Sequence, residues 1–391
     1  MDKSRANQVQ QSCAHQESSS RVHLVPQSSA HQAPTRLVLI DGNAILHRAF
    51  HALPPLTAPD GRVVNAVYGF TTMLLRLIRD LQPTHLAVAF DRPAPTFRKE
   101  LYKEYQAKRP KMDDELIPQV DKIHDLLTAF SIPIFEKDGF EADDIMGTIV
   151  HDIIDEHKIK TQDERKKSRA NLAPSSSAHQ VNQIIIVTGD RDLLQLVEDD
   201  KILVYMPTKG LSEGKLYGEK ETEERLGVKP SLVPDYKALA GDASDNYPGI
   251  PGIGPKTAVE ILKKAGSIDS LYASIGKKSF GLSDALVQKI REGKESALLS
   301  HQLATINREV PINIDIPTFS ENQMTKKQAI EMLQTFGFRS LIKRLEKGNG
   351  ENGQRDKEIK KPASRRGANA SRGGQRDKEK EENDTEQLPL V

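Results

Sequence analysis

Aspartates come directly or soon after three short apolar stretches of the chain. These are Asp41 after residues 37–40, Asp91 after residues 86–90, and Asp190 with Asp192 after residues 184–187. Apolar runs this short are typical of strands in a parallel sheet that is covered on both faces. Because ligands bind beyond the carboxyl ends of the strands in open α/β sheets, we expect these four carboxylates to converge on one rim.

Two further acidic clusters lie outside the apolar stretches. Glu141, Asp143 and Asp144 stand where a helix is expected to begin, and Asp242 and Asp245 stand ahead of a glycine-rich turn. The i,i+3 spacing within each cluster predicts that its outer two carboxylates share one helix face. Taken singly, each cluster could equally serve a helix start or a turn.

Nine carboxylates from five separate segments would repel one another at a single rim and raise their own pKa values. Divalent cations would relieve that repulsion. Oxygen ligands without histidine or cysteine suit Mg²⁺ or Mn²⁺. Two such ions ~4 Å apart form the usual arrangement for phosphoryl transfer. The sequence therefore predicts a two-metal site that acts on phosphate esters.

The elements between these residues alternate between strand and helix. A helix is expected between the first two strands, because its apolar residues recur with a period near 3.6. Those residues are Val67, Phe70, Leu74, Leu77 and Ile78. The alternation predicts a doubly wound α/β sheet. From about residue 233 the strand signals stop, and short helices with glycine- and proline-rich turns are expected as far as residue 345.

Residues 97–111 mix basic and aromatic side chains. The residues that would share one helical stripe are Arg98, Tyr102, Tyr105 and Arg109. Aromatic rings stack on unpaired bases and guanidinium groups hold phosphates, so this stripe predicts contact with single-stranded nucleic acid. An amphipathic helix with a solvated charged face is the alternative.

Glycine and proline are concentrated in residues 249–258. Glycines at alternate positions allow the backbone to approach a ligand closely, and Pro255 suits the first turn of a helix. Backbone N–H groups at that helix start would face a phosphate. The expected DNA contacts are Gly252, Ile253, Gly254, Lys256 and Thr257. The spacing differs from the phosphate loop of nucleotide hydrolases, so duplex binding is predicted, with a plain inter-helix turn as the alternative.

Composition limits the class of protein more than the partner. Lys and Arg number 56 against 55 Asp and Glu, so a net charge of +1 indicates no particular ligand. The one cysteine, Cys13, excludes disulfides within the chain and cysteine-based zinc sites, and it favours a reducing compartment. No signal peptide and no apolar run near ~20 residues is evident, so we expect a cytoplasmic protein.

Polar composition predicts disorder at both ends, because ordering such segments would bury little apolar surface. Short repeats shared with the N-terminal end mark residues 161–182 as a surface insertion between a helix and a strand. The predicted organisation is 1–35 disordered, 36–232 an α/β domain that carries most of the carboxylates, 233–345 a helical domain, and 346–391 a disordered charged tail.

Together these residues resemble the 5′ nuclease domain of bacterial DNA polymerase I, in the flap endonuclease superfamily, over about residues 37–345. The matching motifs are Asp41-Gly42-Asn43, Ala89-Phe90-Asp91, Thr96-Phe97-Arg98, Glu141-Ala142-Asp143-Asp144, Thr188-Gly189-Asp190-Arg191-Asp192-Leu193-Leu194, Gly241-Asp242-Ala243-Ser244-Asp245-Asn246 and Pro251-Gly252-Ile253-Gly254. The resemblance implies a PIN-like parallel-sheet domain followed by a helix-three-turn-helix (helix-hairpin-helix) domain that grips duplex DNA, often through K⁺. It also implies an arch around residues 97–118 that a 5′ single strand passes through.

All nine acidic positions match the metal-binding positions of that family. The resemblance implies structure-specific 5′-3′ exonuclease or flap endonuclease activity in replication and repair, with a catalytic set of Asp41, Asp91, Arg98, Tyr105 and Arg109. No polymerase domain follows residue 345, so a monomer that acts alone or beside a separate DNA polymerase is expected. A DNA-binding protein that cleaves weakly or not at all is the main alternative. A PIN-domain ribonuclease is less consistent with residues 233–345.

One residue of the arch departs from the family. Gln106 stands where relatives usually carry a lysine that is thought to hold or activate the scissile phosphate. Lys108 lies two positions further on, about 200° around a helix, so it could contact DNA but could not replace that lysine in a helical arch. We therefore expect slower chemistry rather than none.

Overall fold

The computed structural model describes residues 35–167, 181–210, 213–275 and 280–346. Both predicted disordered ends and most of the predicted insertion at 161–182 lie outside the described residues. Residues 161–167 continue the helix that precedes them, so the helix ends later than expected, and the insertion itself stays a prediction. No helix among the described residues is both long enough and apolar enough to cross a membrane.

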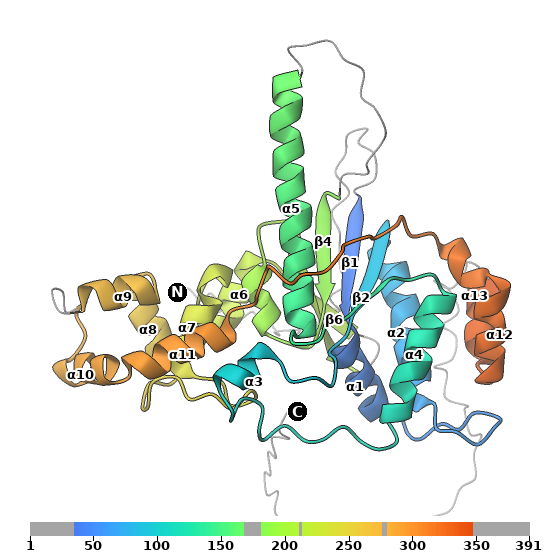
Figure 1. Ribbon diagram of the computed structural model, residues 1–391, viewed down its shortest axis with the longest axis horizontal. Helices are drawn as coiled ribbons and strands as arrows, with labels where there is room; N and C mark the ends of the chain where they lie inside the picture. The colour runs from blue at the N-terminus through green and yellow to red at the C-terminus, as the bar shows by residue number, and fades with distance from the viewer. Residues whose placement is uncertain (1–34, 168–180, 211–212, 276–279, 347–391) are drawn as a thin grey trace, which may run out of the picture. The chain divides into compact units, whose positions relative to one another are not determined.

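A six-stranded sheet forms the centre of the fold (Figure 1). Its strands are β1 (Arg36–Asp41), β2 (His85–Ala89), β3 (Ile134–Phe135), β4 (Gln183–Val187), β5 (Ile202–Lys209) and β6 (Glu213–Tyr217). Their order is β3-β2-β1-β4-β5-β6, parallel except for the antiparallel β6. The predicted strands at 37–40, 86–90 and 184–187 are confirmed. They occupy adjacent central positions, so their carboxyl ends share one rim.

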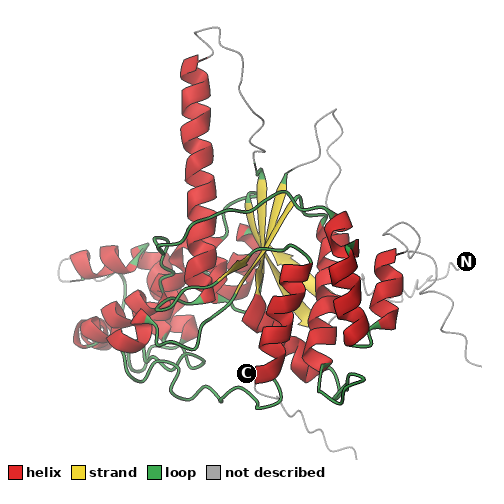
Figure 2. Cartoon of the chain, turned by 45° about the vertical axis from the view of Figure 1, so that its right-hand side comes forward, coloured by secondary structure: helices red, strands yellow, loops and turns green. Residues whose placement is uncertain are grey.

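Helices cover both faces of the sheet (Figure 2). One face carries α1 (Gly42–Ala52), α2 (Asn65–Leu81) and α4 (Ile117–Ala129), and the other carries α5 (Ala142–Lys167) and η1 (Asp192–Leu196). Alternate residues of β1 enter the two cores, as a strand geometry requires: Val38 and Ile40 pack on the first, Leu37 and Leu39 on the second. The buried face of α2 contains all five residues predicted from its period.

The chain becomes helical after β6, as predicted. The elements are α6 (Glu219–Leu226), η2 (Pro230–Leu232), α7 (Val233–Ala240), α8 (Pro255–Ala265), α9 (Ile268–Ser274), α10 (Asp284–Glu292), α11 (Lys294–Ala304), η3 (Glu321–Thr325), α12 (Lys327–Thr335) and α13 (Arg339–Glu346). Helices α7 to α10 enclose a core of their own, which includes Leu239, Ile261 and Leu271. Pro255 begins α8, so the predicted helix start is confirmed.

The last two helices return to the sheet. Residues 305–319, orange in Figure 1, run from α11 across the strands, where Phe319 N–H donates to Thr84 O at 2.7 Å beside β2. Leu333 and Leu341, from α12 and α13, are fully buried in the core shared with α2 and α4. The predicted boundary between residues 232 and 233 stays a prediction, but α12 and α13 pack with the sheet rather than with the helices at 233–304.

The arch segment is not the helix that the sequence spacing predicts. Helix α3 covers only Phe97–Leu101, and Tyr102 ends it in an extended conformation. Turns then continue the chain, and Gln106 adopts a left-handed backbone with φ of 53°. The expected helical stripe along residues 98–109 is therefore wrong, and so is the 200° offset between Gln106 and Lys108.

The packing of α12 gives a stability prediction. We expect Leu333→Ala to lower the free energy of unfolding by about 2–5 kcal/mol, because it opens a cavity in the core beneath α2 and α4. Exposed Gln334 on the same helix provides the control variant, Gln334→Ala. Urea denaturation monitored by circular dichroism measures both, and equal values for the two variants would contradict this packing.

Candidate metal centre

Two of the predicted carboxylates are joined by a threonine. Asp41 ends β1 and caps α1, where its Oδ1 accepts from Ala44 N–H at 2.9 Å. Its Oδ2 accepts from the Thr188 hydroxyl at 2.7 Å, and the Thr188 oxygen accepts in turn from Asp190 N–H at 2.9 Å. Thr188 thus holds the end of β1 against the turn after β4. Sequence reasoning noted Thr188 only as part of a motif.

Asp91 is held between β2 and α5. Its backbone N–H donates to Asn43 Oδ1 at 3.1 Å, and its own Oδ1 accepts from Ala142 N–H at 2.7 Å. The ring of Phe90 lies so close to Gly42 that a Cβ there would be 2.3 Å from it. Only glycine at position 42 permits this approach, which brings Asp41 and Asp91 to the same rim.

Arg98 makes a buried network with the start of α5. Its Nη1 and Nη2 each lie 2.7 Å from an oxygen of Asp144, and Nη1 also lies 3.2 Å from Glu141 Oε2. The Tyr105 hydroxyl donates to the same Glu141 oxygen at 3.2 Å. Arg98 is only 2% exposed. Its guanidinium therefore positions carboxylates, and its predicted contact with DNA finds no support in this geometry.

A second group of carboxylates lies beside the first group, which contains Asp41, Asp91 and Glu141. Among the described residues, only Asp192, Asp242 and Asp245 offer oxygens that all lie within 4.8 Å of one another. Lys237 of α7 reaches into this group and forms ion pairs with Asp192 and Asp242. Sequence reasoning missed Lys237. Its position five residues before Asp242 was the available signal, but a single lysine on a helix is usually solvated.

A closed turn, not a helix, holds the last two carboxylates. Residues 242–247 form a loop closed by hydrogen bonds of 2.9 and 3.0 Å between Asp242 and Tyr247, so the predicted shared helix face is wrong. The loop closes because two glycine backbones meet at its neck. A Cβ on Gly249 would lie 2.2 Å from Gly241 N, and both residues have positive φ. The side chains of Asp242 and Asp245 still converge.

The arch closes over Asp245. Gln106 donates to Asp245 Oδ1 through its side chain at 3.2 Å and to Asp245 O through its backbone at 2.8 Å. The half-exposed Arg109 guanidinium lies 3.9 Å from the same carboxylate. Tyr105 stacks on Tyr247 with ring centroids 6.3 Å apart. Arg109, unlike Arg98, thus remains available to a ligand.

Burial and mutual repulsion dominate the electrostatics of the site. Burial, then the charge of Asp91, raises the pKa of Asp41 to about 7. Burial also raises the pKa of Glu141 to about 7 and that of Asp192 to about 8. Burial and four neighbouring carboxylates raise the pKa of Asp143 well above its usual range. Although burial opposes its charge, Asp192 and Asp242 help raise the pKa of Lys237 well above normal.

The donor set fits hard divalent cations. Every candidate ligand is a carboxylate oxygen, as Mg²⁺ and Mn²⁺ prefer. The buried Tyr247 hydroxyl, which the charges of Asp192 and Asp245 influence, has no hydrogen-bond partner among the described residues. A hydrated cation would supply water to that hydroxyl. Both oxygens of Asp144 already accept hydrogen bonds, so its prediction as a ligand has the weakest support.

The glycine-rich turn lies on the helical side of the molecule. Gly252, with φ of 78°, is exposed, and Gly254 precedes α8, whose first turn carries exposed Lys256 and half-buried Thr257. Ile253 instead packs into the helical core, and its N–H donates to Ile250 O at 3.0 Å. Ile253 therefore shapes the turn, and neither its side chain nor its N–H is free to contact DNA.

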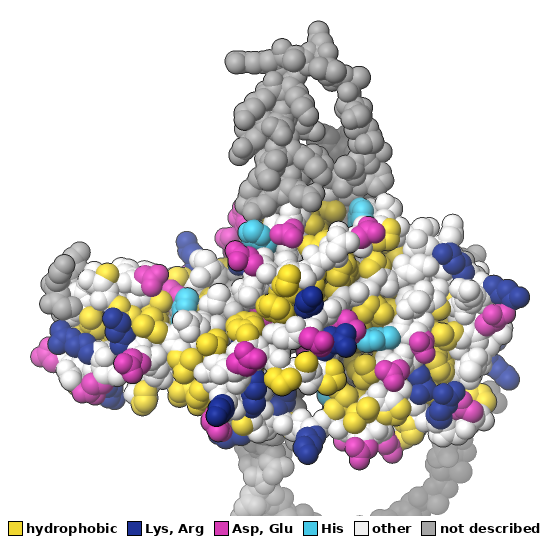
Figure 3. Space-filling view, viewed as in Figure 1, with side chains coloured by type: hydrophobic (Ala, Val, Ile, Leu, Met, Phe, Trp, Pro, Cys, Tyr) yellow, Lys and Arg dark blue, Asp and Glu magenta, His cyan; other side chains and the backbone are white. Residues whose placement is uncertain are grey.

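A lysine that the sequence reading missed lies over the same turn. A Cβ on Gly252 would approach Lys289 Nζ to 2.9 Å, which places this α10 side chain beside the turn. Elsewhere on the face shown in Figure 3, basic and acidic side chains are interspersed around a band of hydrophobic ones. Charge on that face therefore does not by itself outline a nucleic-acid path.

Comparison with known families agrees with this geometry. Residues 36–164 match the family described as 5′-3′ exonuclease, N-terminal resolvase-like domain. Residues 228–327 match the one described as 5′-3′ exonuclease, C-terminal SAM fold. The chain belongs to the 5′-3′ exonuclease family. As a member of this family it is a nuclease, and the predicted PIN-like sheet domain with a helical second part is confirmed.

Relatives of this 5′-3′ exonuclease family member are much longer proteins. DNA polymerase I of Caldicellulosiruptor bescii is 37% identical over 311 residues, which cover 79% of this chain and 33% of the relative. DNA polymerase I of Bacillus subtilis is 36% identical over 316 residues, covering 81% and 33%. The chain thus spans about a third of the length of these curated relatives.

Solved structures show the same fold as this 5′-3′ exonuclease family member. The bacteriophage T5 flap endonuclease, in a pseudo-enzyme–product complex with DNA and metal ions, has a TM-score of 0.53 and 16% identity. The match covers 80% of this chain and 97% of that one. The T5 5′-exonuclease with bound zinc has a TM-score of 0.51 and 17% identity, and the match covers 80% and 98%.

The raised pKa of Asp41 gives a prediction about pH. Its folded pKa of about 7 exceeds the ordinary value of 3.8, so the folded protein holds this proton more tightly. Stability of the metal-free protein should therefore fall as pH rises from about 4 to 7. We expect Asp41→Asn to flatten this decline and to stabilise the metal-free protein at pH 7.5 by about 1–3 kcal/mol.

Unfolding in urea with a chelator present, measured from pH 4 to 8, provides the comparison. The asparagine can keep the hydrogen bond from Ala44, and the Thr188 hydroxyl can turn to accept from its amide, so the cap survives. Parallel pH profiles for the two proteins would show that Asp41 does not carry the predicted shift.

Proposed function

We propose that this chain is a structure-specific 5′-3′ exonuclease and flap endonuclease that hydrolyses DNA phosphodiester bonds with two Mg²⁺ or Mn²⁺ ions. The observation that carries the proposal is the convergence of carboxylates from five separate segments at one rim of a 5′-3′ exonuclease fold. The DNA complex of the T5 flap endonuclease, which shares this fold, supports DNA as the substrate.

Each group of carboxylates would hold one ion. Asp41, Glu141, Asp143 and Asp190 would serve the first, and the cluster around Asp192 the second. When bound, such ions activate a water molecule and stabilise the leaving oxygen. The protein itself orients these ligands, through Thr188 for Asp41 and through Arg98 for Glu141. Lys237 would compensate the charge of the second group while a cation is not bound there.

The neighbouring elements would hold the DNA. Arg109 and Lys108 on the arch are exposed and can reach a phosphate backbone. The N–H groups at the start of α8, with Lys256, would hold the duplex backbone, and a K⁺ ion at that turn is part of the proposal. The proposal also includes that the protein is a cytoplasmic monomer, which acts in replication and repair beside a DNA polymerase.

One observation favours a second function. Gln106 supplies a neutral amide where the resemblance leads one to expect lysine, which is consistent with a DNA-binding protein that cleaves weakly. The raised pKa values around Asp143 favour cleavage, because a cluster that only bound DNA would gain nothing from mutually repelling carboxylates. A chelator distinguishes the nuclease from the DNA-binding protein. Removal of divalent ions should abolish the cleavage product of a nuclease, whereas a protein that only binds DNA forms no metal-dependent product.

Asp143 provides the test of the proposed activity. We expect Asp143→Ala to reduce the cleavage of a 5′-labelled flap duplex in Mg²⁺ by at least about 100-fold. Loss of a residue that only hydrogen-bonds a metal ligand typically costs about 10–100-fold, and loss of a ligand itself should cost more. Flap binding, measured by fluorescence anisotropy, should persist. Release of the intact flap by the wild type indicates endonuclease action, and mononucleotides indicate exonuclease action. Wild-type rates in the variant would refute the assignment.

Position 106 tests the departure in the arch. We expect Gln106→Lys to raise the single-turnover cleavage rate about 10-fold, because a cation there can stabilise charge on the scissile phosphate. Gln106→Met is the matched variant: it removes the side-chain hydrogen bond to Asp245 and adds no charge. If lysine and methionine give the same rate, the charge at this position has no part in the chemistry.

A further inference from the structure

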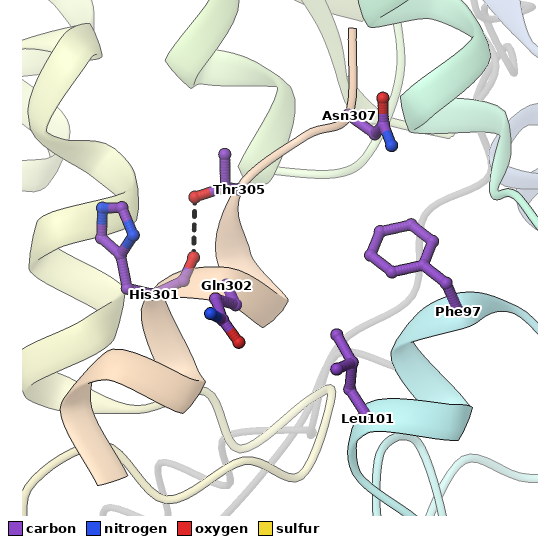
Figure 4. Close-up of a pocket in the computed structure, with 6 residues that line it drawn as sticks. All are labelled: Phe97, Leu101, His301, Gln302, Thr305 and Asn307. Atoms are coloured by element: carbon purple, nitrogen blue, oxygen red, sulfur yellow. Dashed lines mark hydrogen bonds between the residues drawn. The ribbon is translucent and has the colours of Figure 1, made fainter. Parts of the chain in front are cut away.

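The chain leaves α11 through a short segment that is helical only in its first two residues and of which only Thr305 is exposed. Leu303 and Ala304 end α11, and Leu303, Ala304 and Ile306 are each at most 3% exposed. Figure 4 shows the chain rising from this helix end through Thr305 to Asn307, opposite Phe97 and Leu101 of α3. We call residues 303–307 the connector. Backbone N–H and C=O groups buried here need partners from elsewhere in the protein.

Gln195 supplies several of those partners. It lies in η1, three residues after Asp192, and is 7% exposed. Its Nε2 donates to Ala304 O at 2.9 Å and to Asp192 O at 3.0 Å, and its Oε1 accepts from Ile306 N–H at 3.0 Å. Both amide hydrogens are therefore used. A single side chain thus joins the connector to the backbone of a residue in the second carboxylate group.

Arg98 and Asp144 complete the same connector from the other side. Arg98 donates to Leu303 O at 2.8 Å and to Thr305 O at 3.0 Å, while Asn307 N–H donates to Asp144 at 2.8 Å. Each residue from 303 to 307 therefore bonds to a side chain at the edge of the metal centre. The connector touches both carboxylate groups, the first through Arg98 and the second through Gln195.

The other end of α11 reaches the glycine-rich turn. The hydroxyl of Ser296 donates to Gly249 O at 2.5 Å, and Gly249 N–H donates to the Ser300 hydroxyl at 3.2 Å. His301 also pairs with Asp235 of α7 at 2.9 Å. A displacement of the glycine-rich turn would therefore move α11, and with it the connector that Gln195 holds.

We propose that Gln195 is a positioning residue, which fixes the Asp192 backbone to the connector and so sets the second carboxylate group for its cation. This inference rests on the proposed function. The amide contacts neither substrate nor carboxylate oxygen, and it acts through the main chain of Asp192. Through α11, the same contact links the element proposed to hold duplex DNA with the site proposed to hold the ion.

A comparison of two buried glutamines tests the proposal. Gln195→Met keeps the length of the side chain and removes three hydrogen bonds. Gln119 of α4 is the matched control: it is 0% exposed, and its amide bonds to Ala66 N–H and Asn65 Oδ1 at the start of α2 and to Glu115 O. Gln119→Met should lower the unfolding temperature without changing metal affinity.

Mn²⁺ binding to DNA-free protein, measured by calorimetry, is the main readout. We expect Gln195→Met to weaken the affinity of one Mn²⁺ site roughly 10-fold, as the loss of an outer-sphere partner does. The Mg²⁺ concentration for half-maximal flap cleavage should rise by a similar factor. If the methionine variant does not fold, Gln195→Asn replaces it: the shorter side chain cannot span from Asp192 to Ala304, so a loss in the same direction is expected.

The outcomes separate the two proposals. If Gln195 variants bind Mn²⁺ as the wild type does, or if Gln119→Met weakens binding equally, the positioning role is refuted. If the wild-type protein itself binds no Mn²⁺ and cleaves no flap, the proposed function fails, whatever position 195 does. Weakened Mn²⁺ binding in Gln195 variants alone, with comparable unfolding temperatures in both methionine variants, supports the inference.

Discussion

Burial of carboxylates, together with their mutual repulsion, at the carboxyl ends of a parallel sheet is the constraint on which the rest of this structure depends. Raising the pKa of Asp41 from 3.8 to about 7 costs on the order of 4 kcal/mol at neutral pH. Burying one leucine contributes roughly 1.5–3 kcal/mol. The cores on both faces of the sheet must therefore offset a site that opposes folding while its carboxylates are charged, which is characteristic of functional rather than structural carboxylates.

The strands and their aspartates could be predicted because a strand that is buried on both faces has a continuous run of apolar residues. Residues 184–187 are apolar without interruption since both faces of β4 are covered, and Asp190 follows at the end where ligands bind. The resemblance added the fold of the second part, because composition alone could not distinguish a DNA-binding turn from any turn between helices. What was predictable thus depended on short runs of sequence.

Tertiary contacts decided the features that could not be predicted. The spacing of Arg98 and Tyr105 fits a helix, yet α3 ends at Leu101 because both side chains turn inward to Glu141. Lys237 looks like any helical lysine until α7 is placed beside η1. Likewise, nothing in the order of the sequence shows that α12 returns to the sheet, since its amphipathic face would fit either core.

The connector could not be predicted from the sequence either, because the hydrogen-bond partners of its buried backbone groups come from distant parts of the chain. A helix leaves the C=O groups of its last turn unsatisfied, and here those of Leu303 and Ala304, like the groups of residues 305–307, depend on Arg98, Asp144 and Gln195, which are distant in the chain. Such a segment cannot move independently of those side chains, because each broken bond would leave a buried polar group unpaired, at about 1–3 kcal/mol. The connector therefore couples α11 to the carboxylate groups, so the glycine-rich turn, which is proposed to hold duplex DNA, could influence the geometry of the proposed ligands from a distance.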